Sequence, residues 1–207
     1  MSYNLSILIP SIDSRRSLLS ELVCDLIRQC GEIKAISNFS KLGCTVLSIG
    51  FDDVEIIIAI DNKQIPTGTK RQMLLELSNN THIVFIDCDD YVYPYYVSEM
   101  VKAIQTNPDC VAINGIYTID GTNPIQWFLS KDNPNTTITI DGKFVYLRTT
   151  NHITAVKREL ALLAGFPPLS IAEDKMYSTC LNSHLKVEVV VTPVMYHYRY
   201  NSKNREY

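Results

Sequence analysis

The hydrophobic residues near the N-terminus fall into short continuous runs, which is the pattern of strands buried on both faces of a sheet. Residues 5–9 form the first run, and Pro10 is expected to end it. The second run is VEIIIAI at residues 54–60, and the third covers residues 83–86. Each run therefore predicts one strand of a central sheet.

Segments with apolar residues at helical spacing separate these runs. Residues 18–27 form the first segment, with Asp13 or Ser14 as the expected N-cap, and residues 68–78 form the second. A third helix is expected after Pro94, which suits a first helical turn. Strands that alternate with helices in this way predict a parallel α/β sheet with crossover helices.

The second half of the chain has a different pattern, but no convincing linker precedes it, so a single domain is expected. Gly121 and Asp141-Gly142 are the expected turns between its strands, and the C-terminal segment MYHYRYNSKN is aromatic and basic. The expected strands cover residues 109–119, 137–147 and 186–191, and the expected helices cover residues 157–164 and 173–183.

Composition narrows the class of protein. The 207 residues are 46% hydrophobic and 20% charged with a net charge of −3, which fits one globular domain and does not indicate a nucleic-acid partner. The N-terminus has neither a basic region nor a long apolar run, so no signal peptide and no membrane-spanning helix are expected. Six cysteines without a Cys-x-x-Cys pair indicate reduced thiols in a cytoplasmic protein.

Acidic residues follow two of the predicted strands, at the edge where open α/β sheets bind ligands. Asp61 follows the second strand, and Asp87, Asp89 and Asp90 follow the third. Asp87 and Asp89 point to the same side of an extended chain, and two such carboxylates suit Mg²⁺ or Mn²⁺. A solvated turn that caps the next helix would explain the same residues.

Two charged pairs each begin a predicted helix. Lys70 and Arg71 come after Gly68, so backbone N–H groups and two cations could face one diphosphate, although the glycine spacing of a Walker loop is missing. Glu173 and Asp174 follow a Pro-Pro break. Each pair could instead be a solvated first turn, where acidic residues interact favourably with the helix dipole.

Taken in order, several segments of the chain resemble glycosyltransferase family 2 over residues 5–202. These segments are LSILIPS, VEIIIAID, GTKRQMLLEL, HIVFIDCDD, GF…AEDKMYSTCL and YHYRYNS. Residues 151–159 and the Tyr-x-Tyr-Arg tail also resemble small glycosyltransferases of phages and large DNA viruses, some of them domains of larger enzymes that glycosylate a capsid protein. A viral protein of this kind would act in the host cytoplasm.

The resemblance implies a single-domain α/β GT-A fold. Its Rossmann-like nucleotide-sugar-binding half, with a mixed, mainly parallel central sheet, would cover about residues 1–114, and its acceptor half about residues 115–207. The activity implied is inverting, metal-assisted transfer of a sugar, from a UDP sugar in most members, to a hydroxyl of a glycan or glycoprotein.

The resemblance also implies roles for the residues that bind the nucleotide. Pro10 and Ser11 would line the base pocket, and Asp61 would hydrogen-bond the base, usually uracil. Lys70 and Arg71 would lie near the ribose and the diphosphate. The chain departs from the family where Asp-Asp-Gly-Ser is common, because the residues after Asp61 are Asn-Lys-Gln, and where Arg-Asn is usual, because Gln follows Arg71.

The acidic residues would carry out the chemistry. Asp89 would be a direct ligand of Mn²⁺ or Mg²⁺, Asp87 would lie near the ribose or the metal, and Asp174 would be the general base with Glu173 beside it. His197 could be a third metal ligand, a phosphate contact or a packed strand residue. The residues proposed near the donor sugar or acceptor are Asp90, Asn151 and His152.

Two other classes compete with this interpretation. A haloacid-dehalogenase-like phosphotransferase also places Asp-x-Asp after an apolar strand, but it generally has Thr or Val where this chain has Tyr91. A non-catalytic nucleotide-sugar-binding module of a larger protein is the second, and the intact set of Asp87, Asp89 and Asp174 argues against it.

Overall fold

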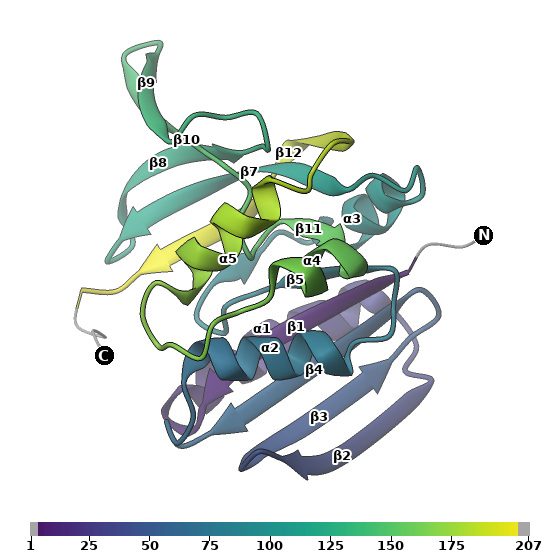
Figure 1. Ribbon diagram of the computed structural model, residues 1–207. Coiled ribbons are helices and arrows are strands. Elements are labelled where there is room, and N and C mark those ends of the chain that lie inside the picture. Colours follow the sequence, from purple (N-terminus) through teal and green to yellow (C-terminus); the bar gives the residue numbers. More distant parts are fainter. Residues whose placement is uncertain (1–3, 203–207) are drawn as a thin grey trace.

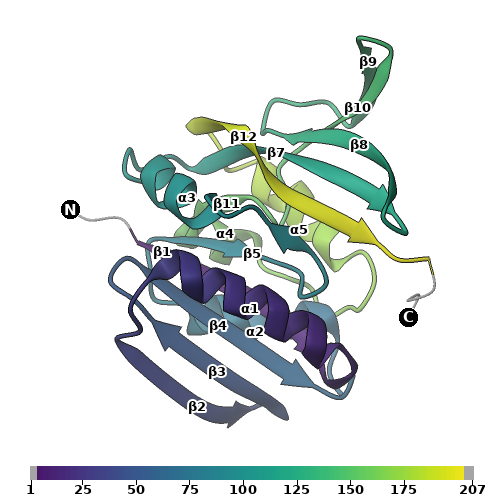
Figure 2. The ribbon, with the colours of Figure 1, turned by 180° about the vertical axis from the view of Figure 1, so that it is seen from behind.

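The computed structural model describes residues 4–202, which form one mixed sheet with helices on both faces (Figures 1 and 2). The strands of the first half are β1 (Leu5–Ile12), β2 (Ala35–Lys41), β3 (Cys44–Gly50), β4 (Val54–Asp61), β5 (His82–Phe85) and β6 (Tyr91–Val92). Those of the second half are β7 (Cys110–Ile119), β8 (Thr122–Leu129), β9 (Thr136–Ile140), β10 (Lys143–Arg148), β11 (Ala155–Lys157) and β12 (Glu188–Tyr200). The helices are η1 (Asp13–Arg15, a 3-10 turn), α1 (Arg16–Cys30), α2 (Thr67–Leu77), α3 (Tyr96–Ile104), α4 (Arg158–Ala164) and α5 (Glu173–Asn182). Within residues 4–202, none of the helices is long and apolar enough to cross a bilayer.

The strand order is β2-β3-β4-β1-β5-β11-β7-β8-β10-β9, and β12 pairs with β6 and β7. β1 lies between β4 and β5 and is parallel to both, so the C-terminal ends of these three strands meet at one edge of the sheet. Parallel pairs occur again at β8–β10 and β7–β12, and the other pairs are antiparallel. The expected mixed α/β fold is confirmed, with a parallel centre at β4-β1-β5.

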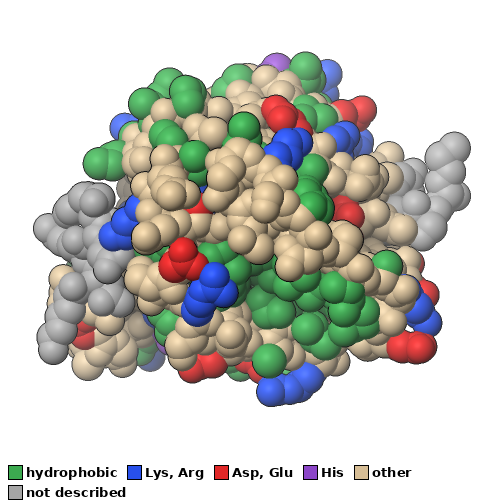
Figure 3. Space-filling model, turned by 90° about the horizontal axis from the view of Figure 1, so that it is seen from below, with side chains coloured by type: hydrophobic (Ala, Val, Ile, Leu, Met, Phe, Trp, Pro, Cys, Tyr) green, Lys and Arg blue, Asp and Glu red, His purple; other side chains and the backbone are tan. Residues whose placement is uncertain are grey.

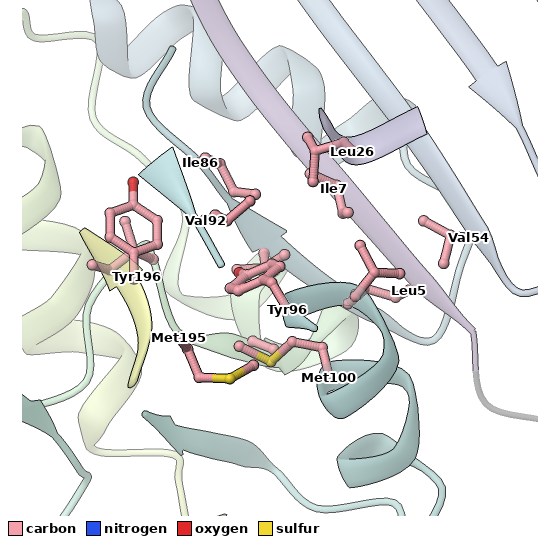
Figure 4. Close-up of a cluster of buried hydrophobic side chains, with 14 of the residues drawn as sticks. Leu5, Ile7, Leu26, Val54, Ile86, Val92, Tyr96, Met100, Met195 and Tyr196 are labelled. Carbon is pink, nitrogen blue, oxygen red and sulfur yellow. The ribbon is translucent and has the colours of Figure 1, made fainter. Parts of the chain in front are cut away.

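The two faces of β1 pack into two different hydrophobic cores, which is why Ile7, Leu8 and Ile9 are apolar in succession. Leu5 and Ile7 face the core under α1 and α3, whereas Leu8 faces the core under α2, α4 and α5. Figure 4 shows the first core, in which Tyr96 and Met100 of α3 approach β1. Burial of apolar surface on both faces contributes roughly 25 cal/mol per Å² and holds the strand ends in place.

Two expectations about the start of the chain were wrong. Pro10 does not end β1, because the ladder with β5 stops at Leu8 while the ladder with β4 continues to Ile12. Alternate residues direct their N–H groups to opposite neighbours, so the missing N–H of Pro10 falls on the side where β5 has ended. Neither Asp13 nor Ser14 caps α1, because both lie in the turn η1 that precedes it.

Sequence analysis missed β2, β3, β6, β8 and β11, and it ended the last strand too early. β2 and β3 form a hairpin in which Leu42 and Gly43 both have positive φ, and Asp120 and Gly121 do the same between β7 and β8. Figure 3 views the molecule from the β2 edge, where hydrophobic side chains gather at the surface. β12 continues to Tyr200 because β7 pairs with it that far, across two register shifts.

Candidate functional site

A cavity of about 580 Å³ lies at the C-terminal ends of the parallel strands. Its wall includes the last residues of β1, the loop after β4, the start of α2 and the segment after β5, together with the loop before α5 and the end of β12. Two acidic side chains, Asp87 and Asp89, line it. The cationic side chains in its lining are Arg15, Lys63, Lys70, Arg71 and Arg199. This excess of positive charge suits a ligand with several negative charges.

Lys70 and Asp61 form a buried ion pair at the wall of this cavity. Lys70 Nζ donates to the Asp61 carboxylate and, at 2.7 Å, to the backbone oxygen of Ser11. The other oxygen of Asp61 accepts from the N–H groups of Gln64 and Ile65 at 2.8 and 3.0 Å. Burial would raise the pKa of Asp61, but the hydrogen bonds from Lys70 and the backbone outweigh it and lower the pKa.

These contacts change the role expected for Asp61. Its side chain is 0% exposed and does not line the cavity, so both oxygens serve the protein itself rather than a nucleotide base. Asp61 joins the end of β4 to α2 through Lys70. Pro10, Ser11 and Lys70 do line the cavity.

A second group of charged side chains connects α2 with the start of α5. Arg71 Nη2 donates to Asp87 Oδ1 at 2.8 Å, and His152 Nε2 lies 3.3 Å from Asp87 Oδ2. Arg71 Nε is 3.5 Å from Glu173 Oε1, and His152 Nδ1 is 4.0 Å from Asp174 Oδ2. The structure therefore brings together five of the predicted residues from separate parts of the chain.

The charge states within this group follow from the pairing. Burial would raise the pKa of Asp87, but Arg71 and His152 hold it well below its usual range. Burial would lower the pKa of Arg71, and the nearby Asp87 and Glu173 raise it instead. Arg71 Nε and Nη1 are buried without a hydrogen-bond partner, although Arg71 lines the cavity. Because Nε already faces Glu173, Nη1 is the atom of Arg71 that favours a further acceptor beside it.

Asp89 is paired with a residue that sequence analysis did not select. Arg15 Nη1 lies 2.9 Å from Asp89 Oδ2, and both side chains are 27% exposed. Arg199 Nε donates to the backbone oxygen of Asp89 at 3.0 Å. Burial and the charge of Asp87 raise the pKa of Asp89 above its usual value, although Arg15 opposes them. No local motif marks Arg15, and the Tyr-x-Tyr-Arg tail contains Arg199 but assigns it no contact with Asp89; only the fold brings both arginines to the strand ends.

Among the acidic residues of the cavity, Asp89 is the one whose carboxylate could hold a divalent cation. Both oxygens of Asp87 are engaged by Arg71 and His152, and residues 4–202 contain no group of three His, Cys, Asp or Glu side chains that could hold a metal. Asp89 lines the cavity with an accessible carboxylate. Mg²⁺ is commonly bound by one or two carboxylates together with substrate phosphates, and Asp89 suits that arrangement.

Two other predicted site residues, His197 and Asp90, contact the protein rather than the cavity. His197 Nε2 is 2.9 Å from Thr118 Oγ1, and His197 does not line the cavity, so the structure does not place it with Asp89. Asp90 is buried and accepts hydrogen bonds from the Tyr196 hydroxyl at 2.7 Å and the Arg199 N–H at 2.9 Å. Burial and the charge of Asp87 raise the pKa of Asp90 well above its usual value.

Asn151 has a supporting position in the same region. Its side-chain oxygen accepts from the N–H of Ile153 at 3.1 Å, within the turn that carries His152. His152 is buried, and its backbone oxygen accepts from the N–H of Phe85 at 3.1 Å. Asn151 and β5 therefore hold His152 against Asp87.

Comparison with known families identifies the class of protein that has this fold and site. The model of the family described as Glycosyl transferase family 2 matches residues 6–161, which is more than half of the chain. The chain therefore belongs to glycosyl transferase family 2. A sequence search of curated proteins finds no match.

Solved structures show the same fold in a longer protein. The crystal structure of S. aureus TarS superposes with a TM-score of 0.62 at 14% identity, covering 95% of this chain and 36% of TarS. TarS 1–349 in complex with UDP-GlcNAc gives the same TM-score at 15% identity, covering 95% of this chain and 58% of that one. This chain thus spans less than two thirds of the length of these TarS chains.

Proposed function

We propose that the chain transfers a sugar from a nucleoside diphosphate sugar to a hydroxyl group of a glycan or glycoprotein. A UDP sugar is the first candidate, since the similar fold of TarS 1–349 has been solved with UDP-GlcNAc. The observation that carries the proposal is the cationic cavity at the strand ends, whose lining includes Arg71 with its buried Nη1 lacking a hydrogen-bond partner. A diphosphate would supply an acceptor for this nitrogen.

The donor would lie across the C-terminal ends of β1 and β5. Pro10 and Ser11 would contact the base, and Arg71 and Arg199 would face the diphosphate. Mn²⁺ or Mg²⁺ held by Asp89 would stabilise the charge that forms on the leaving diphosphate. Lys70 would keep the cavity wall in shape through Asp61 and add positive charge.

Asp174 is the proposed general base. Its side chain is 46% exposed in the first turn of α5, close to the Asp87–His152 pair but outside the cavity lining. It could therefore accept the proton of an acceptor hydroxyl arriving from solvent while that oxygen attacks the anomeric carbon. With the leaving diphosphate on the opposite face, direct displacement would invert the anomeric configuration. Glu173 would support Arg71.

Release of UDP from a panel of UDP sugars with Mn²⁺, with and without saccharide acceptors, tests this function. Asp174→Asn should lower kcat by about 10² or more, the usual contribution of a general base, and leave the donor KM within a few-fold. Asp52→Asn is the control, because the Asp52 side chain is 82% exposed and does not line the cavity. Transfer by Asp174→Asn at the wild-type rate would exclude Asp174 as the base.

The same panel separates the enzyme from a binding module. A donor sugar that raises the melting temperature shows binding to the native state, whether or not it is turned over. Binding without UDP release from any donor or acceptor in the panel would support a non-catalytic module instead.

A further inference from the structure

Two consecutive arginines at the start of α1 have different surroundings. Arg15 lines the cavity and forms an ion pair with Asp89, with Nη1 and Oδ2 at 2.9 Å. Arg16 does not line the cavity, and its 65% exposed side chain pairs with Asp13. Arg15 thus places a positive charge on the carboxylate that the proposed function assigns to the metal ion.

The guanidinium of Arg15 and a divalent cation compete for Asp89. A carboxylate oxygen that accepts a hydrogen bond from Arg15 has less capacity for a metal ion, and the two cations repel each other at short range. Asp87 cannot replace Asp89, because Arg71 and His152 occupy its oxygens. In the protein without nucleotide, the Arg15–Asp89 pair therefore lowers the affinity for the metal.

A diphosphate changes this balance. It brings negative oxygens into the cavity that Arg15 lines, and a guanidinium binds phosphate oxygens as readily as a carboxylate. Transfer of Arg15 from Asp89 to the diphosphate would leave the Asp89 carboxylate to the metal ion. Arg15 would then be neutralised by the diphosphate, and Asp89 by the metal ion.

We propose that Arg15 is a positioning residue that couples metal binding to nucleotide binding. It blocks Asp89 in the nucleotide-free protein and moves to the diphosphate when the nucleotide binds. This inference rests on the proposed function, because it assumes a nucleoside diphosphate in the cavity. Coupling of this kind is reciprocal, so the metal must also raise the affinity for the nucleotide by the same factor.

Titration calorimetry with Mn²⁺, UDP and both together tests the proposal on wild type, Arg15→Gln and Arg16→Gln. Without UDP, Arg15→Gln should bind Mn²⁺ about tenfold more tightly than wild type, because a repelling charge is gone. Without Mn²⁺, it should bind UDP less tightly. The factor by which UDP raises Mn²⁺ affinity should be smaller than in wild type, and Arg16→Gln should match wild type.

A Mn²⁺ affinity of Arg15→Gln that equals or falls below the wild-type value, without UDP and with unchanged near-UV circular dichroism, overturns the proposal. The increase in Mn²⁺ affinity must also disappear in the double variant Arg15→Gln/Asp89→Asn. An increase that persists in the double variant overturns the proposal as well. If Mn²⁺ affinity does not rise but UDP-sugar turnover still depends on Asp174, this inference fails and the proposed function stands. A rise in Mn²⁺ affinity in a protein that binds no UDP or UDP sugar supports the competition at Asp89, overturns its coupling to UDP, and refutes a UDP sugar as the donor.

Discussion

Gly68 holds the loop before α5 against the first turn of α2, and a single methyl group should separate the two. The N–H of Gly68 donates to the backbone oxygen of Leu169 at 2.8 Å. A Cβ at position 68 would lie 1.9 Å from the backbone oxygen of Pro167 and 3.1 Å from the Cβ of Glu173. Because the nearest atom belongs to the backbone, Gly68→Ala must displace the loop that leads to Asp174.

The displacement of this loop should lower the transfer rate far more than it lowers the unfolding free energy. Real Cβ atoms essentially never approach another heavy atom within 3.0 Å, so the loop must move by about 1 Å. Overpacking of this kind costs about 1–3 kcal/mol, and the better helix propensity of alanine offsets up to about 1 kcal/mol. A misplacement of about 1 Å can lower a rate by about 10². We therefore expect a roughly 100-fold lower kcat and a loss of unfolding free energy between about 0 and 3 kcal/mol.

Urea unfolding and steady-state transfer from the UDP sugar identified in the donor panel measure the two quantities. Gly50→Ala is the matched control, because its Cβ would meet only Ala35, at 3.6 Å and beyond, and its backbone φ is not in the left-handed region. Gly50→Ala should keep the wild-type kcat. A Gly68→Ala protein with the wild-type kcat would refute the argument that this contact positions Asp174.

Two further predictions concern the buried ion pairs. Lys70→Met should lower the unfolding free energy at pH 7, measured by urea unfolding, by about 3–5 kcal/mol, because it leaves the buried carboxylate of Asp61 without its cation. Adding Asp61→Asn should recover part of this loss. A loss of unfolding free energy below about 1 kcal/mol for Lys70→Met would contradict the prediction. Burial would raise the pKa of Asp87, but Arg71 and His152 lower it. The ionised Asp87 therefore stabilises the fold fully above the unfolded pKa of about 4, and this stabilisation is lost as the pH falls towards the folded pKa. Between pH 5 and pH 2, wild type should lose about 2 kcal/mol more than Asp87→Asn in urea unfolding, and equal losses would show that the pairing does not stabilise the fold.

Local sequence patterns were sufficient for the elements that carry most of the site. The apolar runs before Asp61 and Asp87 predicted strands β4 and β5, because a strand buried on both faces must be continuously hydrophobic. The start of α5 at Glu173 was expected at that residue, since the Pro-Pro break and the acidic first turn are both local signals. The hairpin of β2 and β3 escaped detection, because its turn places a leucine, Leu42, in a left-handed conformation.

The roles of the charged residues depend on distant neighbours. Asp61 was expected to face a base, but Lys70 and two backbone N–H groups take both of its oxygens. His197 was a candidate ligand, but its position on β12 places its ring against Thr118 of β7.

The sequence by itself determined where the strands end and which acidic residues stand there, because strand periodicity and burial are local properties of the chain. Only the tertiary structure decided how those acids are paired, with Arg15 at Asp89 and with Arg71 and His152 at Asp87. Coulombic attraction acts over a few ångströms of space, and the sheet brings together charges that lie far apart in the sequence.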